Sequence, residues 1–176
     1  VWTTDSLTVT LGGSVVIDGV SVFLMGALLL LAAMSVLIMA ERFGGVGSDA
    51  FTPMGASTPG SSQEDVATRA GYATSEVFPL TLFAVLGMMV FLTANDLITM
   101  FVGLEVLSLP LYILTGLARR RRLLSQEAAL KYFLLGAFSS AFFLFGAALL
   151  YGFAGSSDLR AIASAISARS SDLDGL

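Results

Sequence analysis

Four long stretches of the sequence are apolar and nearly free of charge, and they limit the possible folds more than any other feature. The stretch 19–40 has no charged residue, and the stretches 77–95, 97–118 and 126–152 have at most two each. About 20 consecutive apolar residues cross the hydrocarbon core of a bilayer as one helix. Only 12% of the residues are charged, against about 25% in soluble domains. The sequence therefore predicts an all-α integral membrane protein, a multi-span bundle with about four spanning helices.

Polar segments separate these stretches. Residues 1–18 are predicted to form a β-hairpin outside the membrane, because two β-type runs flank a Gly-Gly pair. The others are a loop at 41–76 with a short amphipathic helix, a basic loop at 119–125, and an amphipathic tail at 153–176 typical of a membrane surface. Arginines lie mostly in the two loops, which the positive-inside rule places on the cytoplasmic or matrix side. The hairpin and the tail then face the outer, periplasmic side.

The composition also excludes several kinds of chemistry. The chain has no cysteine and no histidine, which removes disulfides, thiolate nucleophiles, Cys/His zinc sites, histidine-ligated haem and cysteine-ligated Fe–S clusters. It has no nucleotide-binding motif, and no basic patch with interleaved aromatic residues that would bind nucleic acid. We expect no metal or cofactor site in this chain, so any redox cofactor belongs to a partner.

Two ionisable residues lie deep inside the predicted spans. Glu105 is eight residues inside the outer end of its stretch, or about 12 Å at the rise of an α-helix. Lys131 is nine residues after Arg122, or about 13 Å from the opposite face. In a core about 30 Å thick, the carboxylate and the amine are predicted to share one buried layer. Because intramembrane ionisable groups commonly serve proton relays, Glu105 and Lys131 are the candidate proton-translocating residues, and Glu105 is the stronger.

Further features of the same stretch accompany Glu105. Ser108, Tyr112 and Thr115 lie at +3, +7 and +10, on the same helical face. These hydroxyls are predicted to form a supporting polar path. Pro110 removes the hydrogen bond to the carbonyl four residues earlier and is predicted to kink the helix beside the acid.

Each of these residues also has a structural interpretation. Glu105 and Lys131 can form a static salt bridge, or Lys131 can pair with Glu127 one turn earlier and extend towards the interface. Hydroxyl side chains often bond the backbone of their own helix. Close helix packing is predicted at three small residues: Gly136, Ser140 and Gly146.

Two long motifs resemble a known family. The run "NDLITMFVGLEVLSLPLYILTGL", a basic loop and "EAALKYFLLGAFSSAFFLFGAALLYG" resemble the antiporter-like N subunit (subunit 2) of respiratory complex I, the proton-pumping NADH:quinone oxidoreductase. The resemblance covers most of residues 1–160 and is weakest in the linker. It implies a fragment, the third to sixth helices of a subunit with about fourteen.

The resemblance assigns roles to the two ionisable residues. The family's fifth-helix acid matches Glu105, and the lysine of its "ALKYF" motif matches Lys131. In the family that acid pairs with a lysine on the seventh helix, which lies outside this chain, so Lys131 is expected to be an accessory charge. Proton translocation would be coupled electrostatically to quinone reduction elsewhere in the complex.

The resemblance also implies which cofactors, partner subunits and membrane surround the chain. NADH, FMN, Fe–S clusters and quinone would be bound by partner subunits. The neighbours would be other membrane subunits, such as the antiporter-like M subunit and the small K subunit, together with lipid. The chain would be a non-redox part of an enzyme complex in a bacterial plasma membrane or an organelle inner membrane. Two other functions stay open: a subunit of a multisubunit Na⁺/H⁺ antiporter, and a structural scaffold with a static Glu–Lys pair.

Overall fold

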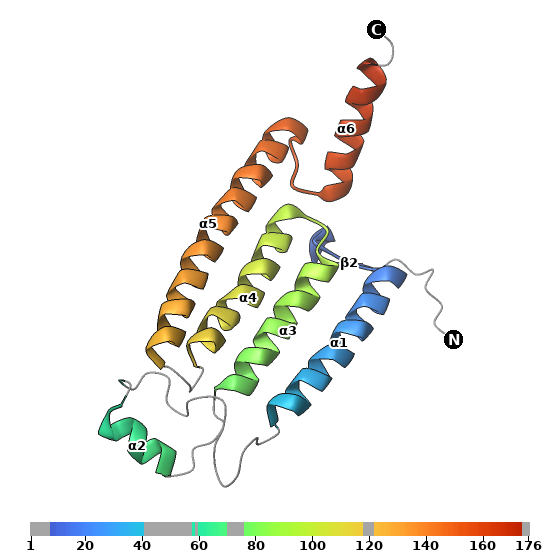
Figure 1. The fold of residues 1–176 in the computed structure, drawn as a ribbon. Helices are drawn as coiled ribbons and strands as arrows, with labels where there is room; N and C mark the ends of the chain where they lie inside the picture. The colour runs from blue at the N-terminus through green and yellow to red at the C-terminus, as the bar shows by residue number, and fades with distance from the viewer. Residues whose placement is uncertain (1–7, 41–57, 59, 70–75, 118–121, 174–176) are drawn as a thin grey trace.

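The structure is a computed structural model that describes residues 8–40, 58, 60–69, 76–117 and 122–173. The chain order is β1 (Thr8–Thr10), the 3₁₀ turn η1 (Leu11–Gly13), β2 (Val15–Ile17), α1 (Gly19–Ala40), α2 (Ser62–Arg69), α3 (Val77–Thr93), α4 (Leu97–Gly116), α5 (Arg122–Ala154) and α6 (Leu159–Leu173). The helices α1, α3, α4 and α5 stand side by side in that order as one layer (Figure 1). We call the end with β1 and β2 the hairpin end. The other end, where α4 ends and α5 begins, is the loop end.

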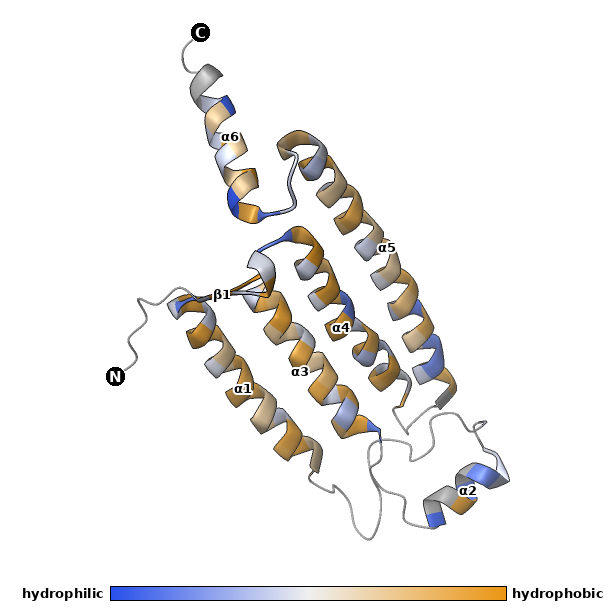
Figure 2. Ribbon diagram, turned by 180° about the vertical axis from the view of Figure 1, so that it is seen from behind, coloured by the Kyte–Doolittle hydropathy of each residue, from blue (hydrophilic) through white to orange (hydrophobic). Residues whose placement is uncertain are grey.

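The predicted membrane fold is confirmed. Three described helices are long and apolar enough to cross a bilayer: α1, α4 and residues Leu123–Ala154 of α5. Helix α3 is equally apolar but has 17 residues, which at about 1.5 Å per residue still gives a length of about 26 Å. Figure 2 shows that apolar residues predominate along all four, whereas α2 and α6 are mixed.

The predicted hairpin is also confirmed. Strands β1 and β2 pair antiparallel, with Val9 opposite Val16. Gly12 and Gly13, in the turn between them, have φ of 67° and 102°, a region that suits glycine because it has no Cβ. The predicted helix at 77–95 ends earlier, at Thr93. It does so because Ala94 is extended and forms a β-bridge with Val15, so the hairpin packs onto the turn between α3 and α4.

The segments after α4 are more helical than predicted. Helix α5 begins at Arg122 rather than at residue 126, because residues 122–125 contain no helix breaker. The remainder of the predicted basic loop, 119–121, lies outside the described residues, as does much of the predicted 41–76 loop. The predicted tail contains α6, whose first turn is capped by the Asp158 carboxylate, which accepts a hydrogen bond from the Ala161 N–H at 2.9 Å.

Two glycines bring α3 and α4 into close contact. A Cβ placed on Gly87 would lie 2.7 Å from the Leu107 Cα, and one placed on Gly103 would lie 2.8 Å from the Phe91 nitrogen. The absence of side chains at these positions therefore allows the two backbones to touch, as is common between membrane helices. This contact fixes the position of α4, the helix that carries Glu105.

Candidate functional site

Glu105 lies on the α5 side of α4. The helix begins at the Asp96 cap, whose carboxylate accepts hydrogen bonds from the backbone N–H groups of Ile98 at 2.9 Å and Thr99 at 2.8 Å. Glu105 follows Leu97 by eight residues, or about 12 Å along the helix. Its side chain is half-buried. The predicted depth of the carboxylate thus follows from a well-defined helix start.

The partner of Glu105 on the neighbouring helix is a serine. The Ser140 hydroxyl on α5 donates a hydrogen bond to Glu105 Oε1 at 2.5 Å, and Ser140 is only 8% exposed. Hydrogen bonds from hydroxyls to carboxylates are short, about 2.5–2.7 Å, and stronger than neutral ones. The sequence alone predicts Ser140 only as a packing residue. Its place opposite the acid depends on the register of the two helices, which no local pattern in the sequence reveals.

Lys131 does not lie in the layer of Glu105. Its ammonium group pairs with Glu127 Oε1 at 2.5 Å, and the two side chains are 68% and 55% exposed. Lys131 precedes Ser140 by nine residues, about 13 Å along α5. The alternative pairing with Glu127 is therefore the one that forms, and the predicted shared layer is not present.

The register of α4 and α5 explains this difference. Gly116, at the end of α4, lies against Ala129: a Cβ on Gly116 would be 3.4 Å from the Ala129 Cβ. The first turns of α5 consequently extend beyond α4 at the loop end. The predicted depth of Lys131 takes Arg122 as the edge of the membrane. Because Arg122 lies beyond the end of α4, this depth places Lys131 too close to the middle of the bundle.

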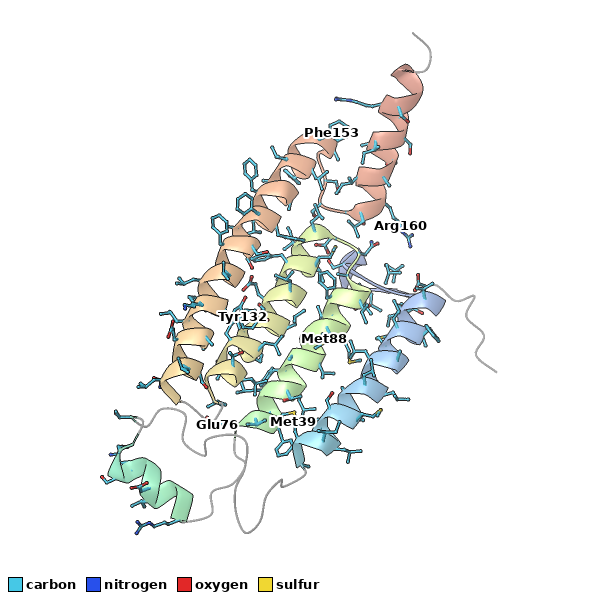
Figure 3. The ribbon with its side chains drawn as sticks, viewed as in Figure 1. Met39, Glu76, Met88, Tyr132, Phe153 and Arg160 are labelled. Atoms are coloured by element: carbon cyan, nitrogen blue, oxygen red, sulfur yellow. The ribbon has the colours of Figure 1, made fainter. Side chains whose placement is uncertain are left out.

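The three predicted path residues differ in what their hydroxyls do. Ser108 donates to the backbone carbonyl of Glu105 at 3.3 Å, and Thr115 donates to that of Leu111 at 2.8 Å. Both hydroxyls are therefore used by their own helix. Tyr112 is 8% exposed and makes edge-on ring contacts with Tyr132 and Phe133 of α5. Figure 3 shows Tyr132 on the side of α5 that faces α4.

Pro110 is buried within α4, which runs unbroken from Leu97 to Gly116. The missing N–H leaves the Val106 carbonyl without its helical partner. This turn packs on α3, because a Cβ on Gly87 would lie 2.7 Å from the Val106 carbonyl carbon. The irregular turn therefore faces α3, whereas the hydrogen bond of Glu105 faces α5. The kink itself stays a prediction.

Sequence reasoning missed a polar junction at the hairpin end. The Asn95 side chain donates to the Gly13 carbonyl and to Asp158 Oδ2, each at 2.9 Å. Its backbone N–H donates to the Ser14 carbonyl at 2.8 Å, and its carbonyl accepts from the Leu159 N–H at 3.0 Å. We call this set the Asn95 junction. It joins the hairpin, the α3–α4 turn and the α5–α6 loop, and the only local signal for it was an Asn-Asp pair between two apolar runs.

Two acidic groups near this end are stabilised as carboxylates. Burial acts to raise the pKa of Asp96, but hydrogen bonds from the backbone and hydroxyl of Thr99, the Ser14 hydroxyl and the Ile98 backbone together lower this pKa below its usual value. The pKa of Asp18, just before α1, is lowered by hydrogen bonds from the backbone and hydroxyl of Ser21. Both helix starts thus favour the charged form of their acids.

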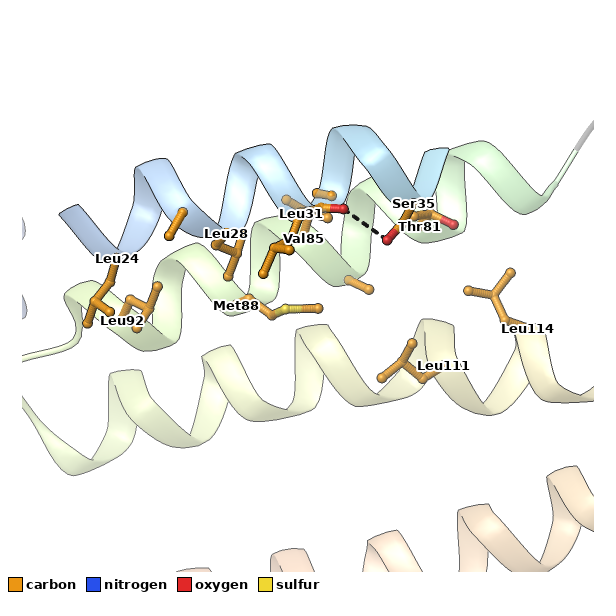
Figure 4. A pocket seen from close by; sticks show the side chains of 13 residues that line it. Leu24, Leu28, Leu31, Ser35, Thr81, Val85, Met88, Leu92, Leu111 and Leu114 are labelled. Carbon is orange, nitrogen blue, oxygen red and sulfur yellow. Dashed lines mark hydrogen bonds between the residues drawn. The ribbon is translucent and has the colours of Figure 1, made fainter. Parts of the chain in front are cut away.

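An apolar groove lies between α1, α3 and α4 and has a volume of about 470 Å³ (Figure 4). Two hydroxyl side chains line it, and both bond their own helices: Ser35 donates to the Leu31 carbonyl at 2.9 Å and Thr81 to the Val77 carbonyl at 2.8 Å. The groove therefore offers apolar contact but no free polar group from these two residues. Its lining does not include Glu105.

One family model matches the part of the chain that carries the candidate site. Residues 94–174, which include Glu105 and Lys131, match the family model described as "NADH:quinone oxidoreductase/Mrp antiporter, TM". A chain from respiratory complex I from Thermus thermophilus with bound Aureothin is 35% identical, with a TM-score of 0.47 over 80% of this chain and 33% of that one. By the family match alone, residues 94–174 are similar to the membrane subunits that this model describes.

The chain is homologous to about a third of NADH-quinone oxidoreductase subunit N. The subunit from Rhodococcus opacus is 57% identical over 92% of this chain and 33% of its own length. That from Beutenbergia cavernae is 58% identical over 93% of this chain and 31% of its own length. The chain thus spans about a third of the length of the curated relatives it matches. The resemblance inferred from the two motifs is confirmed.

Proposed function

We propose that this chain is part of the membrane arm of a proton-translocating NADH:quinone oxidoreductase and that Glu105 contributes to the proton path. One observation carries the proposal: the Glu105 carboxylate lies about 12 Å along an apolar helix and is held by the buried Ser140 hydroxyl of the next helix. An ionisable group at such a depth is costly, and in membrane proteins it commonly serves translocation.

In this proposal Glu105 acts through its charge. Its Oε1 is bonded to Ser140, while Oε2 accepts no hydrogen bond from the described residues. Because the side chain is only half-buried, a cationic group from a segment outside this chain can approach it. The negative charge of Glu105 stabilises the protonated, cationic form of that group, and loss of this charge favours release of its proton. Quinone reduction elsewhere in the complex would drive the change.

Lys131 has a smaller role in the same proposal. It is paired with Glu127 on its own helix and is exposed, so it does not compete for Glu105. We assign it an accessory charge near the loop end. The polar path is reduced to Tyr112, because the other two hydroxyls are bonded to the backbone of α4.

The redox cofactors of the complex would be bound by partner subunits. The absence of cysteine and histidine supports a chain without a redox centre, with NADH, FMN, Fe–S clusters and quinone bound elsewhere. The partners would include the antiporter-like M subunit and the small K subunit. The bacterial sources of the relatives support a location in the plasma membrane.

A second candidate function is a subunit of a multisubunit Na⁺/H⁺ antiporter. The description of the matching family names an antiporter, the Mrp antiporter, beside the oxidoreductase. The identities of 57% and 58% to subunit N favour the first candidate. Proton movement that requires Na⁺ and proceeds without quinone would favour the antiporter.

The test compares two carboxylates in the assembled complex. Glu105→Gln removes the charge but keeps a hydrogen-bond acceptor for Ser140, and Glu127→Gln is the matched control on an exposed acid. We expect the first variant to lose proton pumping, and the second to pump like the wild type. Equal pumping by both variants would refute the role of Glu105.

A further inference from the structure

The starting point is the hydroxyl of Tyr112. Tyr112 is 8% exposed, and its ring packs edge-on against Tyr132 and Phe133, with centroid distances of 4.7 and 5.7 Å. Its hydroxyl has no hydrogen-bond partner among the described residues, although the rings around it are well packed. Buried hydroxyls in proteins are nearly always satisfied, by protein groups or by ordered water.

Gly136 determines where this hydroxyl lies. A Cβ on Gly136 would overlap the Tyr112 hydroxyl, so the glycine provides the space that the hydroxyl occupies against α5. Ser140 follows Gly136 by four residues, and Cβ atoms at this spacing on a helix are about 5–6 Å apart. The Tyr112 hydroxyl beside Gly136 and the Ser140 hydroxyl therefore lie about one helical turn apart along α5, a spacing that one water molecule with two hydrogen bonds of about 2.8 Å each can bridge.

We propose that one water molecule binds between α4 and α5 and bridges the hydroxyls of Tyr112 and Ser140. Ser140 already donates its proton to Glu105, but a hydroxyl oxygen has two lone pairs and can accept from the water. The water in turn accepts from the Tyr112 hydroxyl. The result is a continuous chain of hydrogen bonds from Tyr112 through water and Ser140 to Glu105.

This chain rests on the proposed function and specifies a branch of the proton path towards the loop end. In a concerted transfer, Glu105 receives the proton of Ser140, Ser140 that of the bridging water, and the water that of Tyr112. Tyr112 receives a proton from a hydronium ion on its loop-end side, which becomes a neutral water molecule. The oxygens of Tyr112, the bridging water and Ser140 each break one O–H bond as they form another, so one proton reaches the Glu105 carboxylate and the three intermediate groups stay neutral.

The first test uses hydroxyl deletions in the whole complex, reconstituted in vesicles. Tyr112→Phe keeps the ring contacts and Ser140→Ala keeps the helix. We expect each to lower the number of protons pumped per quinone reduced several-fold, and the double variant to be no worse than the more affected single variant. Thr115→Val is the matched control, because it removes a hydroxyl that bonds only its own helix, and it should pump like the wild type.

A second test reads the carboxyl group directly. In infrared difference spectra of the assembled complex, Tyr112→Phe should shift the Glu105 carboxyl band. The wild-type band should also shift when H₂¹⁸O replaces water, and Tyr112→Phe should lose this isotope shift. Thr115→Val should change neither. Gly136→Ala, which fills the hydroxyl position, should reproduce the Tyr112→Phe spectrum. Gly146→Ala is its control, because a Cβ there meets nothing within 4 Å.

The outcomes separate this inference from the proposed function. If Glu105→Gln loses pumping while Tyr112→Phe pumps normally with an unchanged carboxyl band, the water bridge is wrong and the function stands. If Glu105→Gln itself pumps normally, the proposed function is wrong. Multiplicative losses in the Tyr112→Phe, Ser140→Ala double variant would also overturn the bridge, because the two hydroxyls would then act independently.

Discussion

Replacing Asn95 by alanine removes the two side-chain hydrogen bonds of the Asn95 junction. One goes to the Gly13 carbonyl and one to the Asp158 carboxylate, each at 2.9 Å. The two backbone bonds of Asn95, to Ser14 and from Leu159, remain in the variant. The hairpin and the α5–α6 loop should therefore stay in place but separate more readily from the α3–α4 turn.

The size of the effect follows from the kinds of bond lost. A neutral hydrogen bond contributes about 0.5–1.5 kcal/mol and one to a charged group about 1.5–3 kcal/mol. Because Asn95 and Asp158 are only half-buried, we take the lower end of both ranges, about 2 kcal/mol in total. Since 1.4 kcal/mol is a factor of ten, the junction should open roughly 30 times more often.

Hydrogen exchange of backbone amides in the intact complex measures this opening. The Leu97 N–H donates to Ser157 and the Leu159 N–H to Asn95, each at 3.0 Å, so both report on the junction. Both amides should exchange roughly 30 times faster in Asn95→Ala, while amides in the middle of α4 keep their rates. Asp158→Asn, which keeps the acceptor oxygen but not its charge, should have a smaller effect. Unchanged exchange at Leu97 and Leu159 would refute the reasoning.

Three further outcomes are expected. Gly103→Ala should destabilise the α3–α4 contact and reduce assembly of the complex on native gels, because its Cβ would lie 2.8 Å from a backbone nitrogen of α3. Gly26→Ala is the control and should assemble normally, because its Cβ would have no neighbouring atom within 4 Å. Lys131→Gln should leave the midpoint of thermal unfolding close to that of the wild type, because exposed ion pairs contribute little to stability and its pair with Glu127 is exposed. A clear loss of stability would mean that Lys131 has another partner. The pKa of Asp96 is lower in the folded chain than its usual value. Its stabilisation of the α4 start is therefore present above the unfolded pKa of about 3.9 and is lost as the pH falls through the folded pKa. Hydrogen exchange in the first turn of α4 should depend less on acid pH in Asp96→Asn, and an unchanged dependence would contradict the assignment.

Much of the fold could be predicted because its signals are local. Long runs of predominantly apolar residues define α1 and α4, and two glycines between β-type runs define the hairpin. The depth of Glu105 was also predictable, since it depends only on the start of its own helix. These features need no knowledge of any other segment.

The surroundings of Glu105 were not predictable, because they depend on how α4 and α5 are aligned. The contact of Gly116 with Ala129 and the fit of Tyr112 against Gly136 set a register in which Ser140, rather than Lys131, faces the acid. The Asn95 junction was missed for a similar reason, because its groups come from three segments that lie far apart in the sequence.

The role of Glu105 in proton translocation is tested most directly by the ratio of protons translocated to quinone reduced in vesicles that contain the assembled complex with Glu105→Gln. Quinone reduction and native-gel assembly are measured on the same preparation, with Glu127→Gln alongside. We expect an assembled complex in which the ratio falls well below that of the Glu127→Gln control. An assembled Glu105→Gln complex with the wild-type ratio would contradict it.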